Sequence, residues 1–163
     1  MRPADFLARA IEPGLALLPD NMESDAARVM LMAIAGQETN WSERRQIPNG
    51  QALGYWQFQQ DGTVGLMDKL PALTQSVLDT CDLQQREAWE ALEYNDAVAC
   101  AFARLLLWSH PEPLPAIGDH AGAWAYYRRL WKPGRPDAKR WLSAYPIAVS
   151  EISKTVTATL PQT

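Results

Sequence analysis

The sequence has few of the residues that metal sites, disulfide frameworks and histidine-based triads require. Its only cysteines are Cys81 and Cys100, and its only histidines are His110 and His120. Two cysteines are too few for a disulfide framework, and no Cys-x-x-Cys pair or Cys/His spacing suggests a zinc site. The histidines flank a proline-rich loop and have no evident serine or cysteine partner. We therefore expect free thiols, no metal and no cofactor.

Long apolar runs are also lacking. No stretch approaches the roughly 20 apolar residues of a membrane-spanning helix. The first residues, MRPADFLARAIEPG, include Asp5 and Glu12 and lack the sustained apolar region of a secretory signal. We expect a chain made in the cytoplasm without a signal peptide. It would reach a target outside the cell only if something else carries or releases it.

The remaining composition is that of a globular protein. The 163 residues suit one domain, and the contents of 47% hydrophobic and 21% charged residues exclude disordered and collagen-like classes. The net charge of −4 argues against binding of polyanions through overall charge. Basic and aromatic residues nevertheless gather in the basic segment, residues 126–141, YYRRLWKPGRPDAKRW. This segment could face phosphates or an anionic polymer, although a solvated helix face is the ordinary interpretation.

Apolar residues recur at helical spacing along most of the chain, which predicts a mainly α fold with at most a small β element around residues 45–58. Residues 55–58 are too few to decide between a strand and the first turn of a helix. We expect one domain over residues 1–155 and a frayed tail over 156–163. The predicted helices cover about 3–18 with a break or kink at Pro13-Gly14, 20–39, 62–70, 72–79, 87–109, 118–131 and 137–153.

Glu38 lies near the end of one predicted helix, at the edge of its apolar stripe. The stripe consists of Met30, Ala33, Ile34 and Gln37. Partial burial, the negative end of the helix and the nearby Trp41 would each raise the pKa of Glu38. A carboxylic acid that stays protonated near neutral pH can donate a proton to a leaving oxygen, the pattern that lysozyme illustrates. The ordinary alternative is a surface glutamate at a helix end.

The segment that follows Glu38 carries a resemblance to a known family. Glu38 and, after a loop, GYWQF at residues 54–58 resemble the lytic transglycosylase and goose-type lysozyme group, in which a helix-end catalytic Glu precedes a Gly-Leu-Met-Gln-Ile/Val strip. The string QETNWSERRQ…GYWQF is similar to phage-encoded members of that lysozyme-like superfamily. Ala125-Tyr126-Tyr127 resembles the Ala-Tyr-Asn segment that brings a tyrosine towards the Glu. The resemblance covers roughly residues 26–135 and departs from the group at Thr39, Trp56 and Tyr127.

The resemblance implies a lysozyme-like helical domain that cleaves peptidoglycan glycan strands, acting as an endolysin or a virion component. Glu38 matches the catalytic acid, and Gln57 matches an amide of the cleft. The residues expected at the substrate are Trp41, Tyr55 and Trp56 as aromatic surfaces, with Tyr126 as the hydrogen-bonding tyrosine and Tyr127 beside it.

Three questions remain open at the level of sequence. Hydrolysis usually needs a second carboxylate, for which Glu43 and Asp61 are candidates, whereas a transglycosylase closes the sugar's own hydroxyl on C1. We favour the second route slightly. A chitin-cleaving enzyme is a neighbouring alternative. A virion structural or nucleic-acid-contacting protein that uses the basic segment is the alternative from another class.

Overall fold

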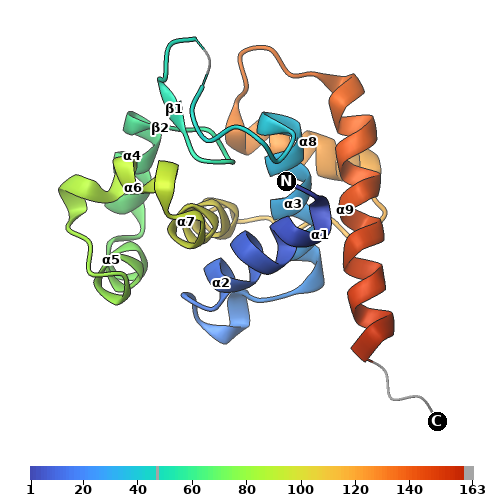
Figure 1. Cartoon of the computed structure of the whole chain (residues 1–163), viewed down its shortest axis with the longest axis horizontal. Coiled ribbons are helices and arrows are strands. Elements are labelled where there is room, and N and C mark those ends of the chain that lie inside the picture. The colour runs from blue at the N-terminus through green and yellow to red at the C-terminus, as the bar shows by residue number, and fades with distance from the viewer. Residues whose placement is uncertain (47, 160–163) are drawn as a thin grey trace.

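The computed structural model describes residues 1–46 and 48–159 and is mainly helical, as predicted, with a small two-stranded sheet (Figure 1). The helices are α1 (Pro3–Phe6), α2 (Glu12–Leu15), α3 (Asp25–Thr39), α4 (Gln60–Lys69), α5 (Pro71–Thr80), α6 (Ala88–Tyr94), α7 (Asp96–Trp108), α8 (His120–Trp131) and α9 (Ala138–Thr159). A π-helical segment spans Leu7–Ile11, and 3-10 turns span Asp20–Met22 and Gln85–Glu87. The strands are β1 (Ala52–Leu53) and β2 (Phe58–Gln59).

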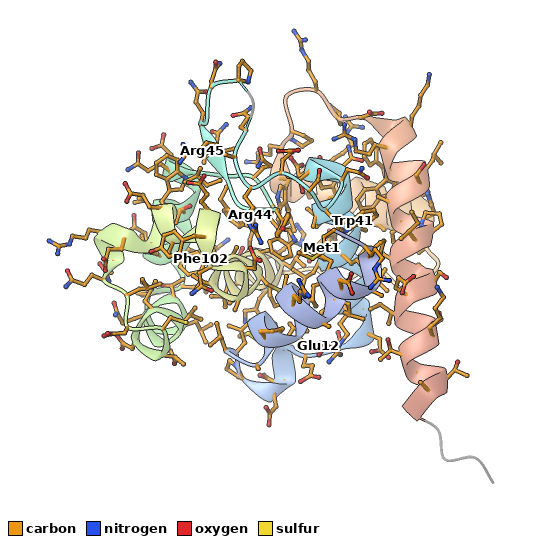
Figure 2. The ribbon with its side chains drawn as sticks, viewed as in Figure 1. Met1, Glu12, Trp41, Arg44, Arg45 and Phe102 are labelled. Atoms are coloured by element: carbon orange, nitrogen blue, oxygen red, sulfur yellow. The ribbon has the colours of Figure 1, made fainter. Side chains whose placement is uncertain are left out.

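The long helix α9 packs along α3 on one side of the molecule, and α4, α5 and α6 gather on the other (Figure 1). Helix α7 runs between these groups and packs against α2, α5 and α6. Apolar side chains from both ends of the chain join one buried cluster. Phe102, in the middle of α7, is fully buried within it (Figure 2).

The ends of α3 follow from the residues that flank it. Ser24 precedes the helix, and its Oγ accepts a 3.1 Å hydrogen bond from the Ala27 amide, the usual N-cap contact. The helix stops where Asn40 adopts a left-handed conformation with φ of 50°, which asparagine tolerates better than most residues. Glu38 therefore lies in the last turn of α3, as predicted.

The first predicted helix does not break at Pro13-Gly14. Instead, it changes from α-helical to π-helical in the residues before them. Pro13 has no backbone N–H to donate, and the chain accommodates it with the π-helical segment Leu7–Ile11 before α2 begins. Gly14 then allows close packing, because a Cβ at this position would lie 2.3 Å from Cβ of Cys100 in α7. Only glycine permits this approach of α2 to α7.

The prediction of one continuous helix over residues 87–109 is wrong. Asn95 divides it into α6 and α7, since its side chain accepts a 3.1 Å hydrogen bond from the Val98 amide and starts a new helix. The Asn95 backbone is extended and its amide donates to the Ala91 carbonyl, which closes α6. The apolar period continues across this cap, so the pattern alone does not reveal the break.

The small sheet lies where it was predicted, with Leu53 of β1 paired to Phe58 of β2. The residues between the strands form a turn, in which the Gln57 amide donates to the Gly54 carbonyl. Gly54 has φ of 74°, and a Cβ there would lie 2.4 Å from the Leu92 carbonyl oxygen. A glycine at this position therefore sets both the shape of the turn and its contact with α6.

Helix α9 continues past its predicted end to Thr159, so the part of the expected frayed tail at residues 156–159 is helical. Residues 160–163 lie outside the described part of the chain. Both Cys81 and Cys100 are free, as predicted. None of the described helices combines the length and the apolar character that crossing a membrane requires.

Candidate active site

Glu38 lies where the core meets solvent. Its neighbours Gln37 and Thr39 are buried, whereas Glu38 keeps part of its surface exposed. The Thr39 hydroxyl lies 2.9 Å from the Ala35 carbonyl and 3.1 Å from the Tyr55 carbonyl, which joins the end of α3 to the turn between β1 and β2. The backbone that carries the Glu38 carboxyl group is thus fixed by hydrogen bonds.

The carboxyl group of Glu38 is paired with Tyr127 of α8. The Tyr127 hydroxyl donates a 2.6 Å hydrogen bond to Oε1 of Glu38. Burial raises the pKa of Glu38 and outweighs two opposing effects, the hydrogen bond from Tyr127 and the positive charge of Arg140. Burial and the Glu38 charge raise the pKa of Tyr127, so the phenol keeps its proton and acts as the donor. The site therefore holds a carboxylic acid that stays protonated to higher pH than an exposed glutamate.

An aromatic stack fixes the position of Tyr127. Its ring stacks on Trp141 of α9, with centroids 5.2 Å apart and an interplanar angle of 15°. Trp141 stacks in turn on Tyr145 at 5.6 Å, and Trp124 lies 5.5 Å from both Tyr127 and Trp141. Because Tyr127 and Trp141 are each 1% exposed, the phenol has little room to turn away from Glu38.

Arg140, near the start of α9, brings a positive charge to the same helix end. Its Nη1 donates a 3.0 Å hydrogen bond to the Gln37 carbonyl, one of the acceptors that the last turn of α3 leaves free. The Gln37 side-chain Oε1 is buried without a hydrogen-bond partner in the described residues. The first turn of α9 therefore lies beside the end of α3 and contributes Arg140 to the site.

Three residues predicted to bind substrate are buried instead. Trp41 is 5% exposed and Trp56 is fully buried, and their indole N–H groups donate to the main-chain oxygens of Met32 and Leu31 at 3.0 and 2.9 Å. Tyr55 is 2% exposed. In this structure the three rings are core residues, and the predicted sugar platform of Tyr55 and Trp56 is not available at the surface.

The structure also changes which tyrosine pairs with the acid. The Tyr126 hydroxyl, predicted to hydrogen-bond Glu38, lies 3.2 Å from the Leu107 carbonyl and 3.3 Å from the Glu112 carbonyl. Tyr127, one position later and on another face of α8, makes the contact with Glu38. Tyr126 therefore anchors the loop after α7, and Tyr127 is the tyrosine of the site.

Gln57 lies in the turn before β2, and Trp131 of α8, which the sequence analysis did not select, contacts the same turn. Gln57 is half-buried with φ of 55°, and its Nε2 donates to the Gly54 carbonyl at 2.9 Å. Trp131 of α8 donates from Nε1 to the Trp56 carbonyl at 2.9 Å and keeps part of its ring exposed. The spacing of Trp124, Tyr127 and Trp131 by three and four residues was the signal that could have identified Trp131 as part of this face of α8.

The two candidates for a second carboxylate are exposed. Glu43 lies in the loop after α3, and Asp61 lies in the first turn of α4. Neither contributes to the pKa shift of Glu38, whose electrostatic causes are Tyr127 and Arg140. Within residues 1–46 and 48–159, no group of three or more His, Cys, Asp or Glu side chains could hold a metal ion. Among the described residues, the hydrogen bonds of the Glu38 side chain lead to Tyr127 and to no second carboxyl group.

Two arginines link the loop after Glu38 to α6 and α7. Arg44 donates to the Asp96 carboxylate at 2.9 and 2.7 Å, and Arg45 donates to the Glu93 carboxylate through Nε and Nη2. Figure 2 shows both arginines on the segment that leads from α3 to β1. These ion pairs therefore fix the segment that joins the end of α3, where Glu38 lies, to β1.

No family model, no curated protein and no solved structure matches this chain. Its function must be inferred from the residues around Glu38.

Proposed function

We propose that this chain is a peptidoglycan-cleaving glycosidase of the lytic transglycosylase type, with Glu38 as general acid. The observation that carries the proposal is the partly buried Glu38 at the end of α3, paired at 2.6 Å with the Tyr127 hydroxyl. The resemblance of Glu38 and GYWQF to the lysozyme-like superfamily supports it. Burial raises the pKa of Glu38, which increases the protonated fraction that a general acid needs.

In the proposed reaction, each of these groups has a part. Tyr127 donates to Oε1 of Glu38, so Oε2 carries the proton and transfers it to the glycosidic oxygen as the bond to C1 breaks. A hydroxyl of the same sugar then bonds to C1 and returns its proton to Glu38. The hydrogen bond from Tyr127 and the charge of Arg140 stabilise the carboxylate that exists between these steps. These contacts are strongest when the carboxylate is charged, as catalysis requires.

The contacts of Glu38 favour the intramolecular route over hydrolysis. Hydrolases usually place two carboxyl groups about 5 to 9.5 Å apart across the scissile bond. Among the described residues, the groups that shift the pKa of Glu38 are Tyr127 and Arg140, and neither is a carboxylate. A closing sugar hydroxyl supplies the nucleophile without a second carboxylate.

Replacement of the acid tests the proposal. Glu38→Gln keeps the shape and removes the transferable proton, so activity on purified peptidoglycan should fall by about two to four orders of magnitude. Circular dichroism should show an unchanged fold. The exposed Glu43→Gln and Asp61→Asn variants are matched controls and should keep full activity. Mass spectrometry of the wild-type products should find anhydro-sugar ends.

Other results would lead to different conclusions. Ordinary reducing ends, together with loss of activity in Glu43→Gln or Asp61→Asn, would make the protein a muramidase with that second carboxylate. Cleavage of chitin oligomers without cleavage of peptidoglycan would identify the neighbouring enzyme class. Full activity of Glu38→Gln would refute the glycosidase assignment.

A further inference from the structure

A second candidate site lies in a hollow that shares no lining residue with the pair of Glu38 and Tyr127. The hollow has a volume of about 460 Å³ and lies between the N-terminus of α3, the end of α7 and the loop before α8. Small-molecule sites have volumes of roughly 300 to 1,000 Å³, so this hollow is large enough for a ligand. Its polar side includes Arg104 and Ser24, and its apolar side includes Trp108, Pro111 and Leu114.

Arg104 is the unusual residue of this hollow. It is only 4% exposed, and its Nε donates a 2.7 Å hydrogen bond to the Met22 carbonyl. Within the described part of the chain, no carboxylate pairs with Arg104, and its terminal nitrogens have no hydrogen-bond acceptor. Its Cζ lies 5.4 Å from the centroid of the Trp108 ring. Burial lowers the pKa of Arg104, as expected for a buried charge without a counter-ion. Such an uncompensated charge is costly unless an anion accompanies it.

The start of α3 adds positive potential at the same place. Ser24 and Ala26 line the hollow, and the first-turn amides of Asp25 and Ala26 have no acceptor within the helix. The positive end of the helix dipole favours an anion at this position. Because α3 has 15 residues, its dipole is well developed and adds to the charge of Arg104.

We propose that this hollow binds the carboxylate of a small ligand with an apolar body, such as the terminal carboxylate of a short peptide. The planar guanidinium of Arg104 matches a carboxylate through two parallel hydrogen bonds. One formal positive charge balances one negative charge, and the rim carboxylate of Glu112, which pairs with Arg129 at 2.6 Å, disfavours a dianion such as phosphate. The ring of Trp108, 41% exposed, offers a surface for the apolar body.

An NMR titration of the wild-type protein tests this proposal with three probes: N-acetylalanine, N-acetylalaninamide and inorganic phosphate. The carboxylate should cause saturable shifts at the Trp108 indole, the Arg104 Nε–H and the Ser24 and Ala26 amides. The amide probe, which lacks the charge, should bind at least tenfold more weakly, and phosphate should bind more weakly than the carboxylate.

Three substitutions complete the experiment. Arg104→Met should weaken binding of N-acetylalanine at least tenfold. Arg128→Met is the control, because Arg128 also lies over a tryptophan, Trp124 at 5.8 Å, but is exposed and does not line the hollow. Glu38→Gln should bind the probe like the wild type, so this site is tested independently of the proposed catalysis.

The wild-type titration keeps the proposal falsifiable even if Arg104→Met does not fold. Equal binding of the acid and amide probes, tighter binding of phosphate, or shifts confined to another surface would each overturn it.

Discussion

At the scale of single residues, opposing effects set the pKa of one carboxyl group, that of Glu38. Burial raises the pKa of Glu38, while the hydrogen bond from Tyr127 and the charge of Arg140 lower it. In the proposed reaction, the same two groups that oppose protonation of Glu38 would stabilise its carboxylate after proton transfer. Removing either group should therefore raise the pKa of Glu38 but lower the rate of the proposed reaction.

The variant Tyr127→Phe tests both effects. The variant keeps the ring in its stack on Trp141 and removes the hydroxyl that donates to Glu38. Loss of this donor should raise the pKa of Glu38, so the alkaline limb of the pH–activity profile should move to higher pH. The maximal rate should fall by about tenfold, the loss of one hydrogen bond to a charged group. An alkaline limb that moves to lower pH would contradict this account of the site.

The raised pKa of Glu38 also predicts how stability depends on pH. In the folded protein the carboxyl group binds its proton more tightly than in the unfolded chain, so the contribution of Glu38 to stability is greatest at low pH. This contribution is lost as the pH rises from the ordinary value of 4.5 through the raised pKa. Glu38→Gln should remove this loss and unfold at a higher temperature than the wild type near neutral pH, with a gain that disappears below about pH 4. Thermal unfolding across this range would measure it.

Glu43→Gln is the matched control for that comparison, since Glu43 is exposed and lies five residues away in sequence. It should show no such pH-dependent gain. A Glu38→Gln variant that is less stable than the wild type at neutral pH would mean that the fold favours the carboxylate.

At the scale of elements, the turn between β1 and β2 depends on Gly54. Gly54→Ala combines a left-handed backbone, φ 74°, with a contact of 2.4 Å to the backbone oxygen of Leu92, so it should lower the free energy of unfolding by about 3 kcal/mol. Gly65→Ala in α4 is the control, because no atom lies within 4 Å of its added Cβ. It should be stabilising by roughly 0.5 to 1 kcal/mol, the helix propensity difference. Urea denaturation measures both, and equal effects would contradict the predicted role of Gly54.

Elements also show what the sequence could and could not predict. Helical periodicity predicted the positions of α3, α4, α5 and α8 well, because apolar residues recur at helical spacing along each of these helices. It missed the boundary at Asn95, where a cap ends one helix without interrupting the apolar period. Residues 55 and 56 lie in a turn, which has no period to show which way the rings face.

The candidate site likewise contains residues that the sequence could predict and residues that it could not. Glu38 could be found from sequence, because its helix, its position in the last turn and the following segment are all local features. The choice between Tyr126 and Tyr127 depends on the rotation of α8 about its axis, which is set by packing against Trp141 from a distant helix. The contribution of Arg140 likewise depends on how α9 packs along α3.

At the scale of the whole molecule, the distribution of charge would affect how the proposed polymeric substrate approaches Glu38. The net charge is −4, yet residues 132–140, which lead from α8 into the first turn of α9 (Figure 1), carry the exposed cationic side chains of Lys132, Arg135, Lys139 and Arg140. The bond from Arg140 to the Gln37 carbonyl places the start of α9 beside the helix end that carries Glu38. An anionic glycan polymer would therefore meet local positive potential next to the acid, on a surface that is otherwise mostly acidic.

Two triple variants with the same net charge test whether this local charge matters. The first replaces three exposed basic residues between the end of α8 and the first turn of α9 with glutamine: Lys132, Arg135 and Lys139. The control replaces three exposed basic residues elsewhere: Arg9, Lys69 and Arg86. In sedimentation with purified cell walls at low salt, the first variant should bind about tenfold more weakly than the control, and the difference should vanish at about 1 M salt, where the Debye length falls to roughly 3 Å. Equal weakening of both would mean that only net charge acts. Tight, steeply salt-dependent binding of the wild type to DNA would instead favour the nucleic-acid alternative for the basic segment.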